Sequence, residues 1–159
     1  MRMILTLGAV ALLLGACTTT FYTETANEIR IHFGLGGEWE ASKKLYRDFD
    51  ATGKQIVLDG FAFSSDGFLA LSIPGSCYTE NAELGLHMAR YLGIWPAREV
   101  TEEATRYLPQ PLRERFRRDA ASWFPVGFLS IGYEELLELW PEGECERVAL
   151  VLPIEGETK

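Results

Sequence analysis

The amino-acid sequence predicts a single α/β domain with a largely parallel sheet. Segments in which apolar and polar residues alternate are interleaved along the chain with segments whose apolar residues recur at helical spacing. Strands and helices that alternate in this way favour a sheet covered by helices. The chain has 159 residues, and residues 28–154 are expected to form this domain, followed by a polar tail at 155–159.

The first half of the domain is expected to contain most of the strands. Ile29, Ile31 and Phe33 alternate with polar residues, which is typical of a half-buried strand. Turns rich in glycine and proline separate the elements that follow. The expected elements are a strand at 29–33, a helix from 39 to about 53, a strand at 55–58, a buried helix at 64–71, and extended segments at 77–78 and 84–87.

The second half is expected to be mainly helical. Thr101 is predicted to cap a helix, because its hydroxyl can accept a hydrogen bond from the first turn. Glu102 and Glu103 would favour the dipole of that helix. The remaining expected elements are a helix at 111–123, a strand at 128–130, a helix at 133–140 and a strand at 147–152.

The start of the chain has the features of a secretory signal peptide. Arg2 is the only charged residue before Glu24, and residues 4–14 contain no ionisable side chain. This apolar run is shorter than the about 20 residues that span a bilayer. The alternative is a buried core helix, but such a helix would keep a polar face, which this segment lacks. Residues 1–16 are therefore expected to be removed.

Cys17 is expected to carry a lipid anchor. The segment Leu14-Gly15-Ala16-Cys17 resembles the bacterial lipobox, which implies a diacylglyceryl group on the Cys17 thiol and an acylated amine after cleavage. Several acyl chains on one residue give stable anchoring. Residues 17–27 would form a lipidated tether in the bacterial cell envelope. Thr18 resembles the pattern sent to the outer membrane, facing the periplasm, where two membranes exist.

The mature chain is acidic, which argues against general binding of nucleic acids. Loss of the leader leaves 14 basic and 23 acidic residues, a net charge of −9, whereas nucleic-acid-binding domains are basic. Four arginines between Arg113 and Arg118 are interpreted as a solvated helix face that Glu114 and Asp119 balance. The alternative is contact with anionic lipid headgroups.

Cys77 and Cys145 are the cysteines that remain once Cys17 is assigned to lipid. Neither lies in a Cys-x-x-Cys pair or near a histidine at metal-ligand spacing, so no metal site and no cofactor are expected. The cell envelope permits disulfides. We predict a Cys77–Cys145 disulfide, with two free thiols as the alternative.

Three features of the first half have the chemistry of an acyl-transfer site. Gly36-Gly37 follows the first strand, Ser64 opens the helix after the next strand, and His87 ends a later strand. Glycine amides can approach a developing oxyanion closely, and a histidine can take the proton of a serine hydroxyl. Each feature alone is common, because serines often cap helices and lone histidines are often structural.

The order and spacing of these features resemble the Clp-protease-like branch of the crotonase superfamily, in particular its small secreted bacterial members. The matching text is IRIHFGLGGEWEASKKLYRDFDATGKQIVLDGFAFSSDGFLAL, CYTENAELGLHMA and FLSIGYEELLEL. The resemblance implies a spiral core of repeated ββα units. It also implies that Ser64 is the nucleophile, His87 the general base, and Gly36 and Gly37 part of the oxyanion hole.

Two departures from the family pattern bear on activity. Asp66 stands where the secreted relatives have a cysteine that would pair with the one matching Cys77. Val126-Gly127 stands where the family has its catalytic aspartate. Without an acid to fix its tautomer and stabilise the imidazolium, His87 would be a poor base.

The sequence therefore leaves two functions open. The missing acid favours a non-catalytic envelope module that binds a peptide or protein partner through the same cleft or through the arginine-rich helix. The alternative is an envelope serine hydrolase, with peptidase as the expected class, in which Ser64 attacks and His87 is the base. Contact with the membrane would be made through the lipid anchor, and no nucleic-acid partner is expected.

Overall fold

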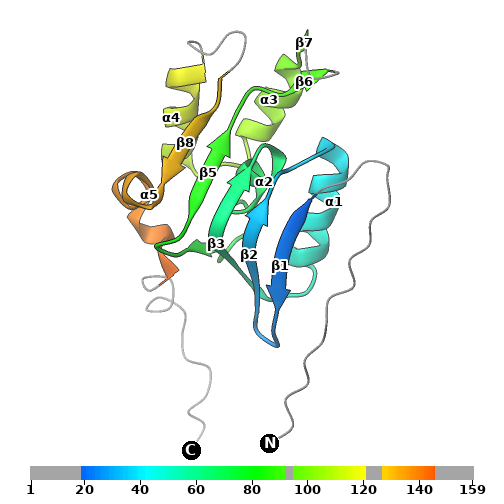
Figure 1. Cartoon of the computed structure of the whole chain (residues 1–159), viewed down its shortest axis with the longest axis vertical. Coiled ribbons are helices and arrows are strands. Elements are labelled where there is room, and N and C mark those ends of the chain that lie inside the picture. Colours follow the sequence, from blue (N-terminus) through cyan, green and yellow to red (C-terminus); the bar gives the residue numbers. More distant parts are fainter. Residues whose placement is uncertain (1–18, 92–94, 121–126, 146–159) are drawn as a thin grey trace, which may run out of the picture.

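The computed structural model describes residues 19–91, 95–120 and 127–145 (Figure 1). In these residues one sheet of six strands, with the order β1-β2-β3-β5-β8 and β4 beside β3, combines with five helices. The α/β class predicted from the sequence is thereby confirmed. The leader, Cys17 and the strand expected at 147–152 lie outside the described residues.

Three parallel strands form the centre of the sheet. They are β2 (Glu28–Gly34), β3 (Gln55–Phe63) and β5 (Glu83–Leu86), and the carboxyl ends of all three point to the upper edge in Figure 1. The short β4 (Cys77–Tyr78) is parallel to the start of β3, and β8 (Leu129–Gly132) is antiparallel to β5. Functional groups of such sheets gather at the carboxyl ends of the parallel strands.

The sheet begins earlier than the sequence predicts. β1 (Thr20–Glu24) pairs antiparallel with β2 and occupies part of the stretch assigned to the tether. β-Branched and aromatic residues make up most of this segment and favour a strand. Because most of its side chains are exposed, the alternation of apolar and polar residues that marks a half-buried strand is missing.

β3 continues beyond the predicted end at Leu58. Asp59-Gly60 has the composition of a turn, but here it forms an irregularity inside the strand, which runs on to Phe63. A Cβ at Gly60 would collide with the carbonyl group of His32 on β2. A glycine inside a strand often marks such a close approach of backbones. The extension carries the chain to the edge where Ser64 lies.

The helices follow the predicted order with shifted ends. They are α1 (Trp39–Asp50), α2 (Ser65–Leu69), α3 (Arg98–Thr105), α4 (Gln110–Ala120) and α5 (Tyr133–Leu139), and a short hairpin of β6 (Arg90–Tyr91) and β7 (Trp95–Pro96) precedes α3. The cap predicted at Thr101 is wrong, because α3 already begins at Arg98. The Thr101 hydroxyl instead donates to the Ala97 carbonyl at 2.9 Å, a common bond for threonine inside a helix.

The hydrophobic core lies between the sheet and the helices. Ile31, Leu58 and Leu84 from the three central strands are fully buried. Phe68 of α2 and Phe116 of α4 pack edge to face with their ring centres 5.2 Å apart. Apolar side chains of α1, α3 and α5 complete the same cluster. This packing fixes α2, and with it the turn that precedes α2, against the centre of the sheet.

The predicted disulfide between Cys77 and Cys145 is confirmed, with the two Cα atoms 4.8 Å apart. Glu144 forms a parallel bridge to Tyr78 of β4, which brings the neighbouring Cys145 beside Cys77. The Tyr78 hydroxyl also donates to the carbonyl of Trp140 at 2.8 Å. The disulfide therefore ties the segment after α5 to the middle of the sheet.

Candidate active site

Ser64 lies in the turn between β3 and α2, in a strained backbone conformation. Its φ is 59° and its ψ −127°, and among the described residues it is the only non-glycine residue with positive φ. Strain of this kind costs about 1–3 kcal/mol and is concentrated at functional sites. The turn is held by the Ser64 amide, which donates to the Gly85 carbonyl at 2.8 Å. The Ser64 side chain makes no capping bond to α2, as an ordinary cap would require.

The structure brings Ser64 and His87 into direct contact. Ser64 Oγ lies 2.8 Å from Nε2 of His87, and Nδ1 of the same ring lies 2.8 Å from the carbonyl oxygen of Met88. A carbonyl oxygen can only accept a hydrogen bond, so Nδ1 carries the proton in the neutral ring. Nε2 then has a free lone pair, and the Ser64 hydroxyl donates to it. Both side chains are half-buried.

The support behind His87 differs from that of a serine–histidine–aspartate triad. In the part of the chain that the structure describes, no carboxylate oxygen lies within ion-pair distance of His87. The Met88 carbonyl fixes the tautomer instead. The ring of Phe63 packs against the imidazole at a centroid distance of 5.1 Å. The ring is therefore oriented, but no carboxylate among the described residues faces its protonated form.

The Gly36-Gly37 loop packs directly against the turn that carries Ser64. Gly36 has a φ of +71°, and a Cβ on it would lie 2.7 Å from the Ser64 Cβ and 2.8 Å from the Ser65 nitrogen. The Gly36 amide donates to Asp66 Oδ2 at 3.1 Å, and the Gly37 amide donates to Ser65 Oγ at 2.9 Å. The two predicted oxyanion donors thus lie beside Ser64 and are bonded to side chains of α2.

Asp66 is buried beneath the site and holds the glycine loop rather than His87. Besides the Gly36 amide, its Oδ2 accepts a bond from the Thr20 hydroxyl of β1 at 2.8 Å. Burial raises the pKa of the Asp66 carboxyl, and the hydrogen bonds from Thr20 and Gly36 oppose that increase. A Cβ at Gly34 would collide with the Asp66 carboxylate, so a glycine is needed there. Asp66 therefore connects β1, the glycine loop and α2.

A contact between two buried serines also supports the Gly36-Gly37 loop. The hydroxyl of Ser65 lies 2.7 Å from that of Ser42 on α1, and both side chains are buried. No sequence pattern singles out Ser42, because it lies among the buried positions of an ordinary amphipathic helix. Ser65 follows the candidate nucleophile directly in the sequence. Its role as the acceptor for the Gly37 amide could not be predicted, because the folded loop creates that contact.

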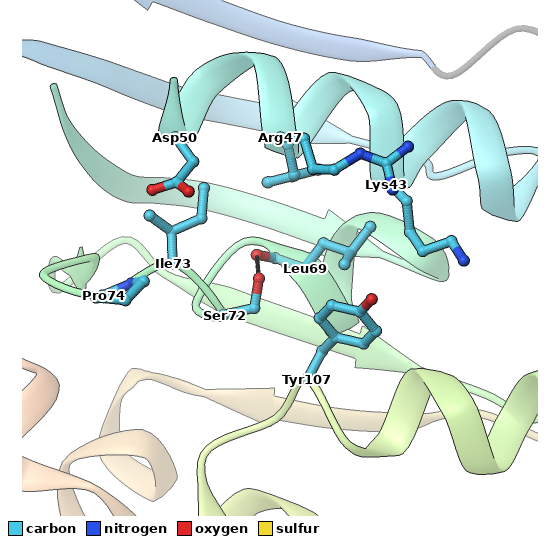
Figure 2. A pocket seen from close by; sticks show the side chains of 9 residues that line it. Lys43, Arg47, Asp50, Leu69, Ser72, Ile73, Pro74 and Tyr107 are labelled. Atoms are coloured by element: carbon cyan, nitrogen blue, oxygen red, sulfur yellow. Dashed lines mark hydrogen bonds between the residues drawn. The ribbon is translucent and has the colours of Figure 1, made fainter. Parts of the chain in front are cut away.

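A cavity lies away from this site, between α1 and the segment from the end of α2 to Pro74. Its volume is about 160 Å³, and Figure 2 shows Lys43, Arg47 and Asp50 of α1 opposite Leu69, Ser72, Ile73 and Pro74, with Tyr107 at one side. The Lys43 ammonium is paired with Glu103 at 2.6 Å, and the Ser72 hydroxyl donates to the Leu69 carbonyl. Neither Ser64 nor His87 lines this cavity, so it adds nothing to the serine–histidine site.

The arginine-rich helix is paired within the protein. Arg115 contacts Glu135 at 2.5 Å and also contacts Asp119, and Arg117 contacts Glu102 at 3.2 Å. Asp119 therefore balances an arginine as predicted, whereas Glu114 accepts a hydrogen bond from Gln110 and the other acidic partners lie on α3 and α5. Across the described residues, no group of three metal-ligating side chains is close enough to hold an ion, and no helix is long and apolar enough to cross a membrane.

No protein-family model, curated protein or solved structure gives a significant match to this chain. Functional inference therefore depends on the geometry of the residues around Ser64.

Proposed function

We propose that this protein is a serine hydrolase held at the bacterial cell envelope by a lipid on Cys17. The 2.8 Å contact between Ser64 Oγ and His87 Nε2 carries the proposal, because a general base must lie within about 2.6–3.2 Å of the hydroxyl that it deprotonates. The strained turn at Ser64 supports it, since strain at an exposed strand-to-helix turn is a feature of serine nucleophiles. The lipobox at residues 14–17 supports the anchor.

The proposed reaction is the hydrolysis of an ester or amide through an acyl-enzyme. Ser64 Oγ attacks the carbonyl carbon while its proton passes to His87 Nε2, and the Nδ1–H bond to Met88 holds the ring in place. His87 then gives the proton to the leaving oxygen or nitrogen, and the acyl group stays on Ser64. Water attacks this ester with His87 again as the base, which releases the acid and restores Ser64.

The negative oxygen of the intermediate requires N–H donors. We assign this role to the Gly36-Gly37 loop together with the amide of Ser65, which directly follows the nucleophile. A substrate oxyanion would take the place of Asp66 and Ser65 as acceptors for the two glycine amides. Because a neutral carbonyl stabilises an imidazolium less than a carboxylate does, slow turnover is expected.

We further propose that the domain has the Clp/crotonase type of spiral core. Parallel strands β2 and β3 are each followed by a glycine or serine turn and then a helix, and the two turns contact one another. This arrangement supports the resemblance through which Gly36, Ser64 and His87 were selected.

A non-catalytic binding module is the second candidate, and two observations favour it. The glycine amides already have acceptors inside the protein, and among the described residues no carboxylate supports His87. Such a module would use the surface around Ser64 to bind a peptide or protein. It would show no hydrolysis that depends on Ser64.

Hydrolysis of p-nitrophenyl esters and of a fluorogenic peptide library by the purified lipoprotein separates these two functions. Ser64→Ala should reduce the rate to the uncatalysed background. Ser72→Ala is the matched control, because Ser72 is a half-buried serine whose hydroxyl donates to the Leu69 carbonyl, away from His87, and its rate should equal that of the wild type. Equal rates in Ser64→Ala and the wild type would reject the hydrolase and leave the binding module.

The anchor is tested separately. Cys17→Ser should abolish labelling by a palmitate analogue in cells and leave the protein uncleaved or free of the membrane. Recovery of the wild-type protein from the periplasm without lipid would reject the anchor and leave the hydrolase proposal untouched.

A further inference from the structure

An apolar surface is exposed on the face of the sheet opposite the helices. Phe21 of β1 and Phe128 before β8 are 67% and 58% exposed, and Phe33 and Leu35 are also exposed. Thr20 and Gly34, which neighbour Phe21 and Phe33 along β1 and β2, face Asp66 on the helix side of the sheet, so Phe21 and Phe33 point to the other face. Large exposed apolar surfaces mark contacts with proteins or membranes.

The aromatic rings form a continuous row across the strands. Phe21 lies directly opposite Phe33 in the β1–β2 pair, so their side chains share one face. The ring centres of Phe33 and Phe61 are 6.1 Å apart, and those of Phe61 and Phe63 are 5.8 Å apart. The row therefore extends from the first strand to the end of β3.

The same row ends at the candidate active site. Phe63 packs against His87, and Phe128 packs edge to face against Phe63 at 5.6 Å. A Cβ at Gly85 would collide with the Phe63 ring, so glycine at this position lets the ring lie flat on β5. The exposed surface and the Ser64–His87 pair are thus parts of one face of the molecule.

Thr19, two residues after the expected lipid attachment point, is bonded to the loop that follows β2, next to the exposed Phe33 and Leu35. The Thr19 amide donates to the Gly36 carbonyl at 3.2 Å, and the Leu35 amide donates to the Thr19 carbonyl at 3.0 Å. Cys17 precedes Thr19 by two residues, a length of chain that spans at most roughly 7 Å. A lipid on Cys17 would therefore hold Phe21, Phe33 and Leu35 within reach of the headgroup region.

We infer that Phe21, Phe33 and Leu35 form a membrane-docking surface whose occupant is the bilayer that holds the Cys17 lipid. Apolar side chains that enter the interface add a second attachment to that of the acyl chains. When this face docks, α4 lies on the other side of the sheet, and its arginines stay paired within the protein. The docked protein would present the Ser64–His87 pair to acyl esters at the membrane surface, a consequence that depends on the proposed hydrolase and anchor.

Site-specific photocrosslinking to lipid tests the docking surface without depending on activity. The lipoprotein is purified from cells, its lipid is verified by intact mass, and it is reconstituted into vesicles of phosphatidylethanolamine and phosphatidylglycerol. The variants are Phe21→p-benzoylphenylalanine and Phe33→p-benzoylphenylalanine. Tyr107→p-benzoylphenylalanine is the control, because Tyr107 is an aromatic residue, 38% exposed, that packs against Trp39 of α1 in the helix layer.

The inference predicts phospholipid adducts at positions 21 and 33 in yields several-fold above position 107. Equal yields at all three positions, or adducts to protein at positions 21 and 33, would overturn it. Hydrolysis of a soluble ester by the same samples reports on the hydrolase independently. A purified protein without lipid would reject the anchor, and with it the docking surface, while leaving the ester assay valid. Phe21 is largely exposed, so its variant serves if the Phe33 variant fails to fold.

Discussion

Ser64 Oγ lies 2.8 Å from Nε2 of His87, a residue 23 positions further along the chain. The pairing of β3 with β5 produces this contact, because Phe63 stands opposite Gly85 in a parallel register and the two strands end at the same edge. Ser64 directly follows β3, and His87 directly follows β5. The contact is therefore a property of the sheet and not of a flexible loop.

The strain at Ser64 predicts that a glycine at this position stabilises the fold. Ser64→Gly should unfold with a free energy about 1 kcal/mol higher than Ser64→Ala, because glycine adopts positive φ without the strain of about 1–3 kcal/mol, offset by its greater loss of backbone entropy. Both variants lose the bond to His87, so their difference isolates the backbone. Urea denaturation measures it, and equal stabilities would show that the turn is unstrained.

Gly36 and Gly53 form a matched pair for testing the packing of the glycine loop. Both have positive φ, +71° and +67°, but a Cβ at Gly53 would meet no atom within 4 Å, whereas one at Gly36 would meet the Ser64 turn. Gly53→Ala should cost about 1 kcal/mol, for strain alone. Gly36→Ala should cost about 3 kcal/mol, because overpacking adds to that strain. Equal losses in thermal unfolding would mean that the loop does not press on Ser64.

Asp59 should stabilise the protein above pH 4. Burial raises the pKa of its carboxyl, but hydrogen bonds from Thr79, Asn81 and Arg30 outweigh that effect and lower the pKa from 3.8 to about 2. Because the pKa in the folded state lies below that of the unfolded chain, the stabilisation is complete above pH 4 and disappears as the pH falls through 2. Its size is about 2 kcal/mol.

The test is the pH dependence of unfolding in Asp59→Asn. The variant should lose about 2 kcal/mol at pH 6 and approach the wild type near pH 2. Asp48→Asn is the control, since Asp48 is exposed and pairs only with Lys44 along α1. A constant difference between wild type and Asp59→Asn across this range would contradict the lowered pKa.

The Cys77–Cys145 disulfide should contribute most of its stability through the unfolded chain. It closes a separation of 68 residues, for which the loop-entropy relation gives about 4 kcal/mol. Cys77→Ser with Cys145→Ser should therefore unfold at a much lower urea concentration than the oxidised wild type. Wild type in reductant should match the double variant. A midpoint that reduction leaves unchanged would exclude the disulfide.

The fold was predictable where local pattern and tertiary packing agree. The alternation at 29–33 and the amphipathic segment after Trp39 gave β2 and α1 nearly as they are. β1 was not predicted because its residues lack the apolar–polar alternation of a half-buried strand. Pairing with β2 holds the segment in the sheet. The predicted strand ended too early at Leu58, because Asp59-Gly60 has the composition of a turn. Only the folded structure shows that Gly60 is a glycine because the backbone of His32 lies against it.

The sequence predicted the site residues whose side chains have a known catalytic chemistry, but not the backbone groups around them. Ser64 and His87 were selected by residue type and order, and the structure brings them together. That Met88 supplies the carbonyl behind His87 could not be predicted, since every residue has a carbonyl and only the folded geometry places one beside the ring. The bond between Asp66 and the Gly36 amide joins residues 30 positions apart, a distance over which no sequence pattern links a carboxylate to a backbone group.

The most direct test of the central claim is active-site labelling by a fluorophosphonate, followed by mass spectrometry of the labelled peptide. The geometry predicts an adduct on Ser64, because among the serines of the described residues only Ser64 contacts an imidazole nitrogen. His87→Ala should slow labelling by at least about 100-fold, the usual contribution of a general base. No adduct on Ser64 in the folded lipoprotein, or equal labelling rates in His87→Ala and the wild type, would contradict the account.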